Sequence, residues 1–214
     1  NPCGEVPLLA NEACNLGSIN LAHFVHEDGG FDFDGLDKIS RICARFLDNV
    51  VTVNKFPVQA VADAVAATRK TGLGVMGWHD VLIKMGIPYD SDQALNMADE
   101  VMSTINKAAL ETSLELATER GPYPACREET PIRNATRTCI APTGSISAIA
   151  GCSSGIEPVF ALAYVKNVLD GQRLQEVNPY LEKIARDRGF YSEEMMEEVA
   201  RTGPIQHISQ VPDD

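Results

Sequence analysis

Three residues at the start of the chain could act together on one bound molecule. If the segment NPCGE runs extended, alternate side chains point to the same side, so Asn1, Cys3 and Glu5 share one face. An amide, a sulfur and a carboxylate would then converge on one chemical group. The alternative is that Cys3 is a small buried hydrophobic residue and Glu5 a solvated charge, and spacing alone favours this alternative.

A second candidate for chemistry is the segment APTGSIS, residues 141–147. Its hydroxyl side chains could donate hydrogen bonds, its glycine lets a ligand approach the backbone, and free N–H groups at a helix start favour a phosphate. The segment has no lysine, so it is not a P-loop. A loop rich in serine, threonine and glycine is more often only a loop, and the residues alone leave both interpretations open.

The segment GLGVMG, from Gly72 to Gly77, matches the G-x-G-x-x-G pattern of dinucleotide-binding proteins, and Asp90 and Asp92 follow near the position of a ribose-binding acid. That fingerprint requires an apolar strand before the first glycine. Here the preceding residues, AVAATRKT, are rich in alanine and helical in pattern. The glycines therefore indicate a close crossing of two backbones instead of a dinucleotide site.

No metal site is predicted from the histidines and cysteines. His23 and His26 are three residues apart on an expected strand, which places them on opposite faces. Cys126, Cys139 and Cys152 recur at intervals of thirteen residues, but this spacing matches no zinc motif. We interpret the interval as a coincidence.

The composition narrows the class of protein. The chain has 214 residues, a net charge of −12 and a pI of about 4.7, so it would repel nucleic acid and anionic membranes. It contains no apolar run long enough to span a bilayer and no secretory signal pattern, which makes the cytoplasm the expected location. Six cysteines are too few for a disulfide scaffold in a chain of this size.

The elements that would position these residues alternate between strands and helices. An irregular loop over residues 1–11 leads into an expected strand over residues 13–25. Apolar residues at helical spacing follow from Asp34, which is placed to cap that helix, and an alanine-rich helix is expected after Pro57. A helix of roughly 28 residues begins at Ser91 and ends at the glycine of ERGPYP.

The remaining pattern also alternates. We expect a buried strand over residues 134–141, a loop of small residues over 142–151, and two short amphipathic helices within 179–189 and 191–203, each closed by a glycine. This order indicates an α/β fold. With no repeat or linker in the sequence, residues 1–214 are expected to form one domain.

Three ordered motifs together resemble the catalytic subunit of ribonucleotide reductase. They are NPCGE with EACNLGSINL, then GLGVMGWHDVLIKMGIPYDS, then TRTCIAPTGSISAIAGCSSGIEP, and they extend over most of the chain. NPCGE and PTGSIS look most like the class II, adenosylcobalamin-dependent branch. The resemblance implies part of a ten-stranded α/β barrel, in which residues 1–11 form a finger loop and residues 141–147 a phosphate loop.

The resemblance also implies a role for each candidate residue. Cys3 would carry a thiyl radical that removes the 3′ hydrogen of a ribonucleotide, Glu5 would accept the proton of the 3′ hydroxyl, and Asn1 would hold the substrate hydroxyls. Cys14 would be one of two thiols that reduce the 2′ position and close a disulfide. The substrate phosphates would be held by Thr143, Gly144, Ser145, Ile146 and Ser147.

The same resemblance implies several partners. They are a ribonucleotide substrate, adenosylcobalamin, upstream and downstream parts of the reductase, and a thioredoxin-like reductant. The second thiol for Cys14 would lie in the upstream part, so the 214 residues alone are expected to be inactive. Two alternatives stay open: a class I fragment whose radical comes from a metal-containing partner, and a non-catalytic remnant that associates with itself.

Overall fold

The computed structural model describes residues 3–159, 161–167 and 173–212. The chain forms two compact units, residues 1–158 and residues 159–214. Each unit has its own hydrophobic core. The mixture of helices and strands agrees with the predicted α/β class. It stays a prediction that both units belong to one barrel domain.

Two parallel strands form the centre of the first unit. Strand β1 (Asn15–Asn20) pairs with β2 (Thr71–Met76) in the register that aligns Asn15 with Thr71. The strand expected over residues 134–141 runs along the other edge of β2, but a single bridge, between Leu73 and Thr138, makes the pairing. The Leu73 N–H donates to the Arg137 carbonyl and the Leu73 carbonyl accepts from Cys139. Because this ladder is so short, the segment is extended without being a regular strand.

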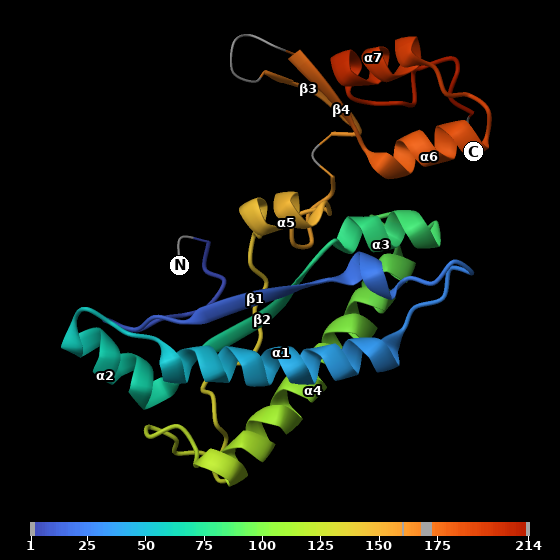
Figure 1. The fold of residues 1–214 in the computed structure, drawn as a ribbon. Helices are drawn as coiled ribbons and strands as arrows, with labels where there is room; N and C mark the ends of the chain where they lie inside the picture. Colours follow the sequence, from blue (N-terminus) through green and yellow to red (C-terminus); the bar gives the residue numbers. More distant parts are fainter. Residues whose placement is uncertain (1–2, 160, 168–172, 213–214) are drawn as a thin grey trace. The chain divides into compact units, whose positions relative to one another are not determined.

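Helix α1 covers one face of the strand pair and also packs against α4 (Figure 1). The core between them is apolar and includes Leu36, Leu47, Val75 and Ile105, each at most 3% exposed. The helices of this unit are α1 (Phe33–Val53), α2 (Gln59–Thr68), α3 (Trp78–Met85), α4 (Asp92–Arg120), α5 (Gly144–Ala150) and the 3-10 turn η1 (Leu21–Phe24). Among the residues that the structure describes, no helix is both long and apolar enough to cross a membrane.

The helix boundaries confirm some predictions and correct others. Ser91 caps α4 by accepting a hydrogen bond from the Ala94 N–H, and the 29-residue helix ends before Gly121, as predicted. The cap of α1 is Asp32 instead of Asp34, because the Asp32 side chain accepts the Gly35 N–H at 2.8 Å. The segment expected to be a loop over 142–151 contains α5, which is short and poor in apolar core residues.

The second unit combines a hairpin with two helices. Strands β3 (Ala163–Asn167) and β4 (Arg173–Val177) pair in antiparallel fashion, and helix α7 packs against both. The two predicted helices are present as α6 (Pro179–Asp187) and α7 (Glu193–Thr202). Strand β4 was not expected, because its two apolar residues, Leu174 and Val177, are three positions apart and do not show the alternation that marks a half-buried strand.

A buried carboxylate joins several elements of the first unit. Asp48 of α1 is fully buried and forms ion pairs with Arg69 at 2.7 Å, Arg120 at 3.1 Å and Arg133 at 3.3 Å. Burial alone would raise the pKa of Asp48, but hydrogen bonding and charge from Arg69, the Asn134 amide and the Arg133 charge lower it below its ordinary range. The ends of α2 and α4 are therefore fixed to the C-terminal part of α1.

The glycines of β2 allow the backbone crossing that the sequence indicated. A Cβ atom added at Gly74 would lie 2.4 Å from the Cys139 carbonyl oxygen, and one at Gly72 would lie 2.7 Å from the Cys139 sulfur. These glycines stand inside a strand that follows helix α2, so the dinucleotide fingerprint is not formed. Close packing against the 134–141 segment explains their position.

Replacing Gly74 with alanine should therefore destabilise the first unit, because the new methyl group meets backbone that cannot move independently. We expect a loss of about 1–3 kcal/mol in the free energy of unfolding. Gly17 on β1 is the matched control, since its added Cβ would lie 3.5 Å from Leu47, an ordinary contact. Urea unfolding of both variants would decide: equal stability of Gly74→Ala and Gly17→Ala would contradict the crossing.

Candidate functional site

The N-terminal loop, residues 3–14, carries the first group of candidates. Cys3 is exposed, and its backbone N–H donates to the Glu5 carboxylate at 3.1 Å. Gly4 between them has a φ of 73°, a left-handed conformation that suits glycine, so the loop turns here and is not extended as assumed from the sequence. Asn1 lies outside the described residues. The turn, not strand alternation, brings the Glu5 carboxylate back to Cys3.

An ion pair anchors the base of this loop. Lys70 donates to the Glu12 carboxylate at 2.6 Å and to the Pro7 carbonyl at 2.8 Å. The same carboxylate accepts the Leu9 N–H and the Thr68 hydroxyl, and its side chain is 3% exposed. Burial alone would raise the pKa of Glu12, but these hydrogen bonds, with Lys70 first, lower it below its ordinary range. The loop is thus fixed to the end of α2 and the start of β2.

Removing the Lys70 charge should loosen this anchor. In Lys70→Met the buried Glu12 keeps its bonds from Leu9 and Thr68 but loses its cation, so we expect the free energy of unfolding to fall by about 1–3 kcal/mol. The exposed Lys55 offers a control with the same substitution and an expected change below about 0.5 kcal/mol. Chemical denaturation of both variants measures the difference, and matching curves would refute the anchor.

Cys14 packs in a small apolar cluster beneath the loop. Val6, Cys139 and Ala141 are buried there, with Leu8 and Cys14 packed against them. Burial, followed by the Glu5 charge, raises the pKa of Cys14. Burial, followed by the charges of Cys14 and Glu5, raises the pKa of Cys139 to about 11. Both shifts favour the protonated thiol over the thiolate.

Cys139 is a member of this cluster that the sequence did not reveal. The spacing of thirteen residues between Cys139 and its neighbours Cys126 and Cys152 does not predict this contact, because neither neighbour belongs to the cluster around Cys14. The available signal was indirect. Cys139 follows the bridge between Thr138 and Leu73, and the sequence did not predict that pairing with the glycine-rich strand.

The second group of candidates lies at the start of α5. Thr143 and Ser147 are buried, and their hydroxyls already have partners: Thr143 accepts the Gly155 N–H at 2.7 Å, and Ser147 lies 2.8 Å from the Ser154 hydroxyl. In contrast, residues 144–146 are exposed. Ser147 is the first residue of α5 whose N–H donates to a backbone carbonyl, that of Thr143. The exposed first turn therefore presents the N–H groups that could bind an anion, whereas the two buried hydroxyls fix its shape.

Both figures show the N-terminal loop and α5 on one side of the strand pair, with α1 on the other. The two described segments that carry the candidates thus lie on the same side of the strand pair. On the metal question, the described part of the chain holds no group of three or more His, Cys, Asp or Glu side chains that could bind an ion. Besides the Glu12 carboxylate that is paired with Lys70, this side offers thiols, the Glu5 carboxylate and exposed backbone amides.

Comparison with known proteins matches the whole chain to one family. Residues 1–131 and 126–214 match the family model described as ribonucleotide reductase, barrel domain. A vitamin B12-dependent ribonucleoside-diphosphate reductase of Thermoplasma acidophilum is 52% identical over 97% of this chain and 28% of the relative. One of the same description from Mycobacterium tuberculosis is 47% identical over 99% of this chain and 31% of the relative.

A solved structure agrees with these sequence matches. The class Id ribonucleotide reductase alpha subunit of Actinobacillus ureae superposes with a TM-score of 0.74 at 29% identity, over 92% of this chain and 36% of that one. The chain spans about three-tenths of the length of the curated relatives, at 28% and 31%.

Proposed function

Because the chain belongs to the ribonucleotide reductase barrel-domain family, we propose that it is part of the catalytic barrel of a ribonucleoside-diphosphate reductase. Together with the remainder of such an enzyme it makes deoxyribonucleotides by thiyl-radical chemistry. The observation that carries this proposal is the folded N-terminal loop, which holds the Glu5 carboxylate against Cys3 and within electrostatic range of Cys14. A radical thiol, a base and a reducing thiol are the groups that the reaction needs.

Each described residue has one task in this reaction. The thiyl of Cys3 removes the 3′ hydrogen atom of the substrate, and the Glu5 carboxylate accepts the proton of the 3′ hydroxyl. The 2′ hydroxyl takes a proton from one of the two reducing thiols and leaves as water, the other thiol supplies the hydrogen that replaces it, and Glu5 returns its proton to the 3′ oxygen. Cys14 and a second thiol supply two electrons and close a disulfide, and the hydrogen atom returns from Cys3 to the 3′ carbon. The net change replaces a hydroxyl with hydrogen and oxidises two thiols.

The substrate phosphates bind at the exposed first turn of α5. Residues 144–146 offer backbone N–H groups at a helix start, where an anion is favoured by hydrogen bonding and by the helix dipole. Thr143 and Ser147 act by holding this turn, since their hydroxyls already bond to Gly155 and Ser154. Asn1 would complete the site by bonding to the ribose hydroxyls.

Adenosylcobalamin is the cofactor that we propose for the intact enzyme. It would supply the one-electron oxidising equivalent that converts the Cys3 thiol to a thiyl radical. The exposure of Cys3 fits a cofactor that must reach the sulfur directly. Residues outside this chain would hold the corrin ring. In the class I alternative the radical comes from a metal-containing partner, and cobalamin binding by the intact protein separates the two.

Reductase assays test the function directly. We expect the full-length reductase that contains this chain to convert a ribonucleoside diphosphate to its deoxy form only when adenosylcobalamin and a dithiol reductant are present. We expect the 214 residues alone to be inactive, because the family resemblance implies that the second reducing thiol belongs to a part of the reductase outside these residues. Turnover by the isolated chain, or by the full-length protein without cobalamin, would contradict the proposal.

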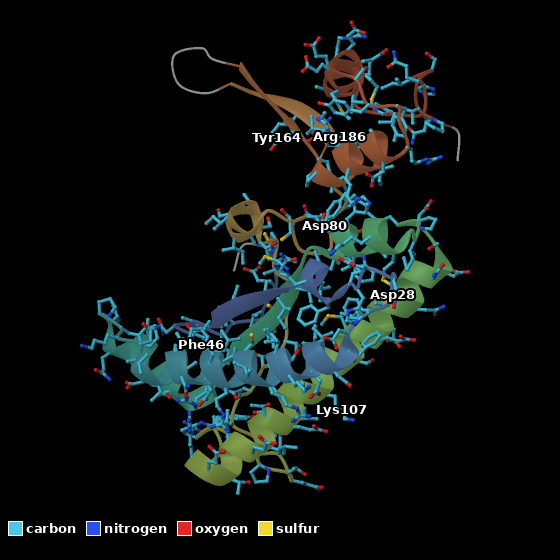
Figure 2. All side chains as sticks on the ribbon, turned by 45° about the vertical axis from the view of Figure 1, so that its right-hand side comes forward. Asp28, Phe46, Asp80, Lys107, Tyr164 and Arg186 are labelled. Carbon is cyan, nitrogen blue, oxygen red and sulfur yellow. The ribbon has the colours of Figure 1, made fainter. Side chains whose placement is uncertain are left out.

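An exposed apolar surface favours a partner polypeptide. Phe46 is 63% exposed and Ile42 62% exposed on the outer face of α1, where Figure 2 labels Phe46. A groove of about 520 Å³ lies beside this face and along β1, with Leu16 and Cys43 in its lining. We assign this surface to the remaining barrel of the reductase. The alternative is a non-catalytic chain that forms homo-oligomers, which sedimentation of the isolated chain would reveal as concentration-dependent association that Phe46→Ser weakens.

The cell compartment follows from the same chemistry. A disulfide formed by Cys14 in each turnover must be reduced again, and a thioredoxin-like protein is the reductant that we propose. Such reductants keep thiols reduced in the cytoplasm. We therefore propose a cytoplasmic enzyme.

A further inference from the structure

The start of helix α3 is capped by a residue from a distant part of the chain. The residue before the helix, Gly77, has no side chain and cannot cap it. Ser153, 73 positions after Asp80, takes this place: its hydroxyl accepts the Asp80 N–H at 3.4 Å, and its own N–H donates to the Asp80 carboxylate at 2.7 Å. This is the reciprocal arrangement of a capping box, formed between two segments instead of within one.

The segment that carries Ser153 is also bound to α5. Ser154 contacts the Ser147 hydroxyl at 2.8 Å, and the Gly155 N–H donates to the Thr143 hydroxyl at 2.7 Å. On its other side the same segment accepts the Gly77 N–H at the Ser153 carbonyl. Residues 153–155 therefore connect the start of α3 to Thr143, which precedes α5, and to Ser147, the fourth residue of α5.

Thr143 needs this support. It has a φ of 54°, a left-handed conformation that is strained for a β-branched residue. A conformation of this kind persists only when its surroundings hold it. The Gly155 N–H is the contact that fixes the Thr143 side chain. Relaxation of Thr143 would turn the N–H groups of the next residues away from a common point.

We propose that Asp80 is a positioning residue for the phosphate-binding turn at the start of α5. Its carboxylate holds Ser153, and through Ser154 and Gly155 it holds Ser147 and Thr143 in the conformation that presents the exposed amides. The inference rests on the proposed function, since it assigns a role in binding the substrate phosphates. Asp80 itself is 2% exposed and is therefore not a contact of the ligand.

The burial of Asp80 supports this role. Figure 2 labels Asp80 at the start of α3. Burial raises its pKa, which the hydrogen bond from the Ser153 backbone opposes. Burying a carboxylate away from solvent costs free energy, because the charge loses its hydration. The position of Asp80 in the first turn of α3 offsets part of this cost through the helix dipole.

Amide hydrogen exchange of the full chain tests the positioning without any ligand. In Asp80→Ala we expect the Gly155 and Ser147 amides to exchange at least tenfold faster, while the Leu73 amide in β2 is unchanged. Asp80→Asn should lie between, because its side-chain oxygen can still accept the Ser153 N–H. Asp34→Ala is the matched control, an exposed aspartate in the first turn of α1. Unchanged exchange at Gly155 and Ser147 in Asp80→Ala would overturn the inference.

Calorimetric titration with inorganic diphosphate tests the consequence for binding. We expect Asp80→Ala to raise the dissociation constant at least tenfold and Asp34→Ala to leave it unchanged. A purely structural role in α3 would lower stability without changing this affinity, and equal affinity in Asp80→Ala and wild type would overturn the inference. If the wild-type chain binds no diphosphate, the phosphate site of the proposed function fails, and the exchange result alone decides whether Asp80 positions the turn.

A milder variant covers the case in which Asp80→Ala does not fold. Ser153→Ala keeps the backbone bond to Asp80 and removes only the hydroxyl that caps α3. We expect the same two amides to exchange faster by a smaller factor, with weaker diphosphate binding. Wild-type exchange and wild-type affinity in this variant would count against the inference.

Discussion

Replacing Cys3 with serine in the full-length reductase should abolish deoxyribonucleotide formation, with a loss of at least about 10³-fold in turnover. The serine hydroxyl keeps the size and polarity of the residue, but its O–H bond is too strong to form the radical that the thiol forms. Cys3 is exposed at the turn of the N-terminal loop, so the substitution leaves the core unchanged. Ribonucleotide binding should therefore persist while turnover falls to the background of the assay.

Cys126→Ser is the control for this prediction. Cys126 is half-buried in the segment after α4, and it belongs neither to the N-terminal loop nor to the Cys14 cluster. The same loss of one sulfur there should leave turnover within about threefold of wild type, as for most substitutions away from a site. Substantial turnover by Cys3→Ser, or equal losses in the two variants, would remove Cys3 from the reaction.

Replacing Asp48 with alanine should destabilise the first unit by about 3–5 kcal/mol, the cost of removing one partner from a buried ion pair. Asp48 is fully buried, and its loss would leave Arg69, Arg120 and Arg133 close together without their common anion. The one tryptophan of the chain, Trp78, lies in the core of this unit and reports its unfolding by fluorescence in urea.

Asp37→Ala on the same helix is the matched control. Asp37 pairs with Arg41 one turn away at the surface, with 34% of its side chain exposed, so its loss should cost about 0.3–0.5 kcal/mol. Similar costs for the two aspartates would contradict the buried hub.

The pH dependence of stability gives a second test of the hub. Because the folded pKa of Asp48 lies below its ordinary value of 3.8, ionised Asp48 stabilises the fold above that pH. The contribution is lost as the pH falls through the folded pKa. Asp48→Ala should lack this part of the loss of stability in acid, so the difference in the free energy of unfolding between wild type and Asp48→Ala should shrink as the pH falls. A difference that stays constant down to about pH 3 would contradict the stabilising role of ionised Asp48.

Strong local patterns predicted the elements that depend on local sequence. Helix α4 was predicted from a long apolar stripe that begins at Ser91 and ends at Gly121, and both ends agree with the structure, which shows Ser91 as the cap. The start of α1 shows the limit of such signals. Asp32 and Asp34 are both suitable capping residues, and only the backbone geometry determines that Asp32 is the cap. Strand β1 ends at Asn20 because that side chain caps the following 3-10 turn.

The candidate site depended on contacts that no local pattern contains. The motif resemblance indicated Cys3, Glu5 and Cys14. The turn at Gly4 depends on its left-handed backbone conformation, and the anchor between Glu12 and Lys70 joins positions 58 residues apart. The cap that Ser153 provides for α3 spans 73 positions. Such pairs become visible only when tertiary packing brings their segments together, which is why Cys139 and Asp80 were not singled out.

We propose that Cys3 carries the radical of a ribonucleotide reductase. Electron paramagnetic resonance of the full-length protein, frozen during turnover with adenosylcobalamin and a ribonucleoside diphosphate, addresses it directly. With cysteine deuterated at the β carbon, we expect a sulfur-centred radical signal that is narrower than with ordinary cysteine and that is absent in Cys3→Ser. A radical signal that is insensitive to this deuteration, or that persists in Cys3→Ser, would contradict the claim.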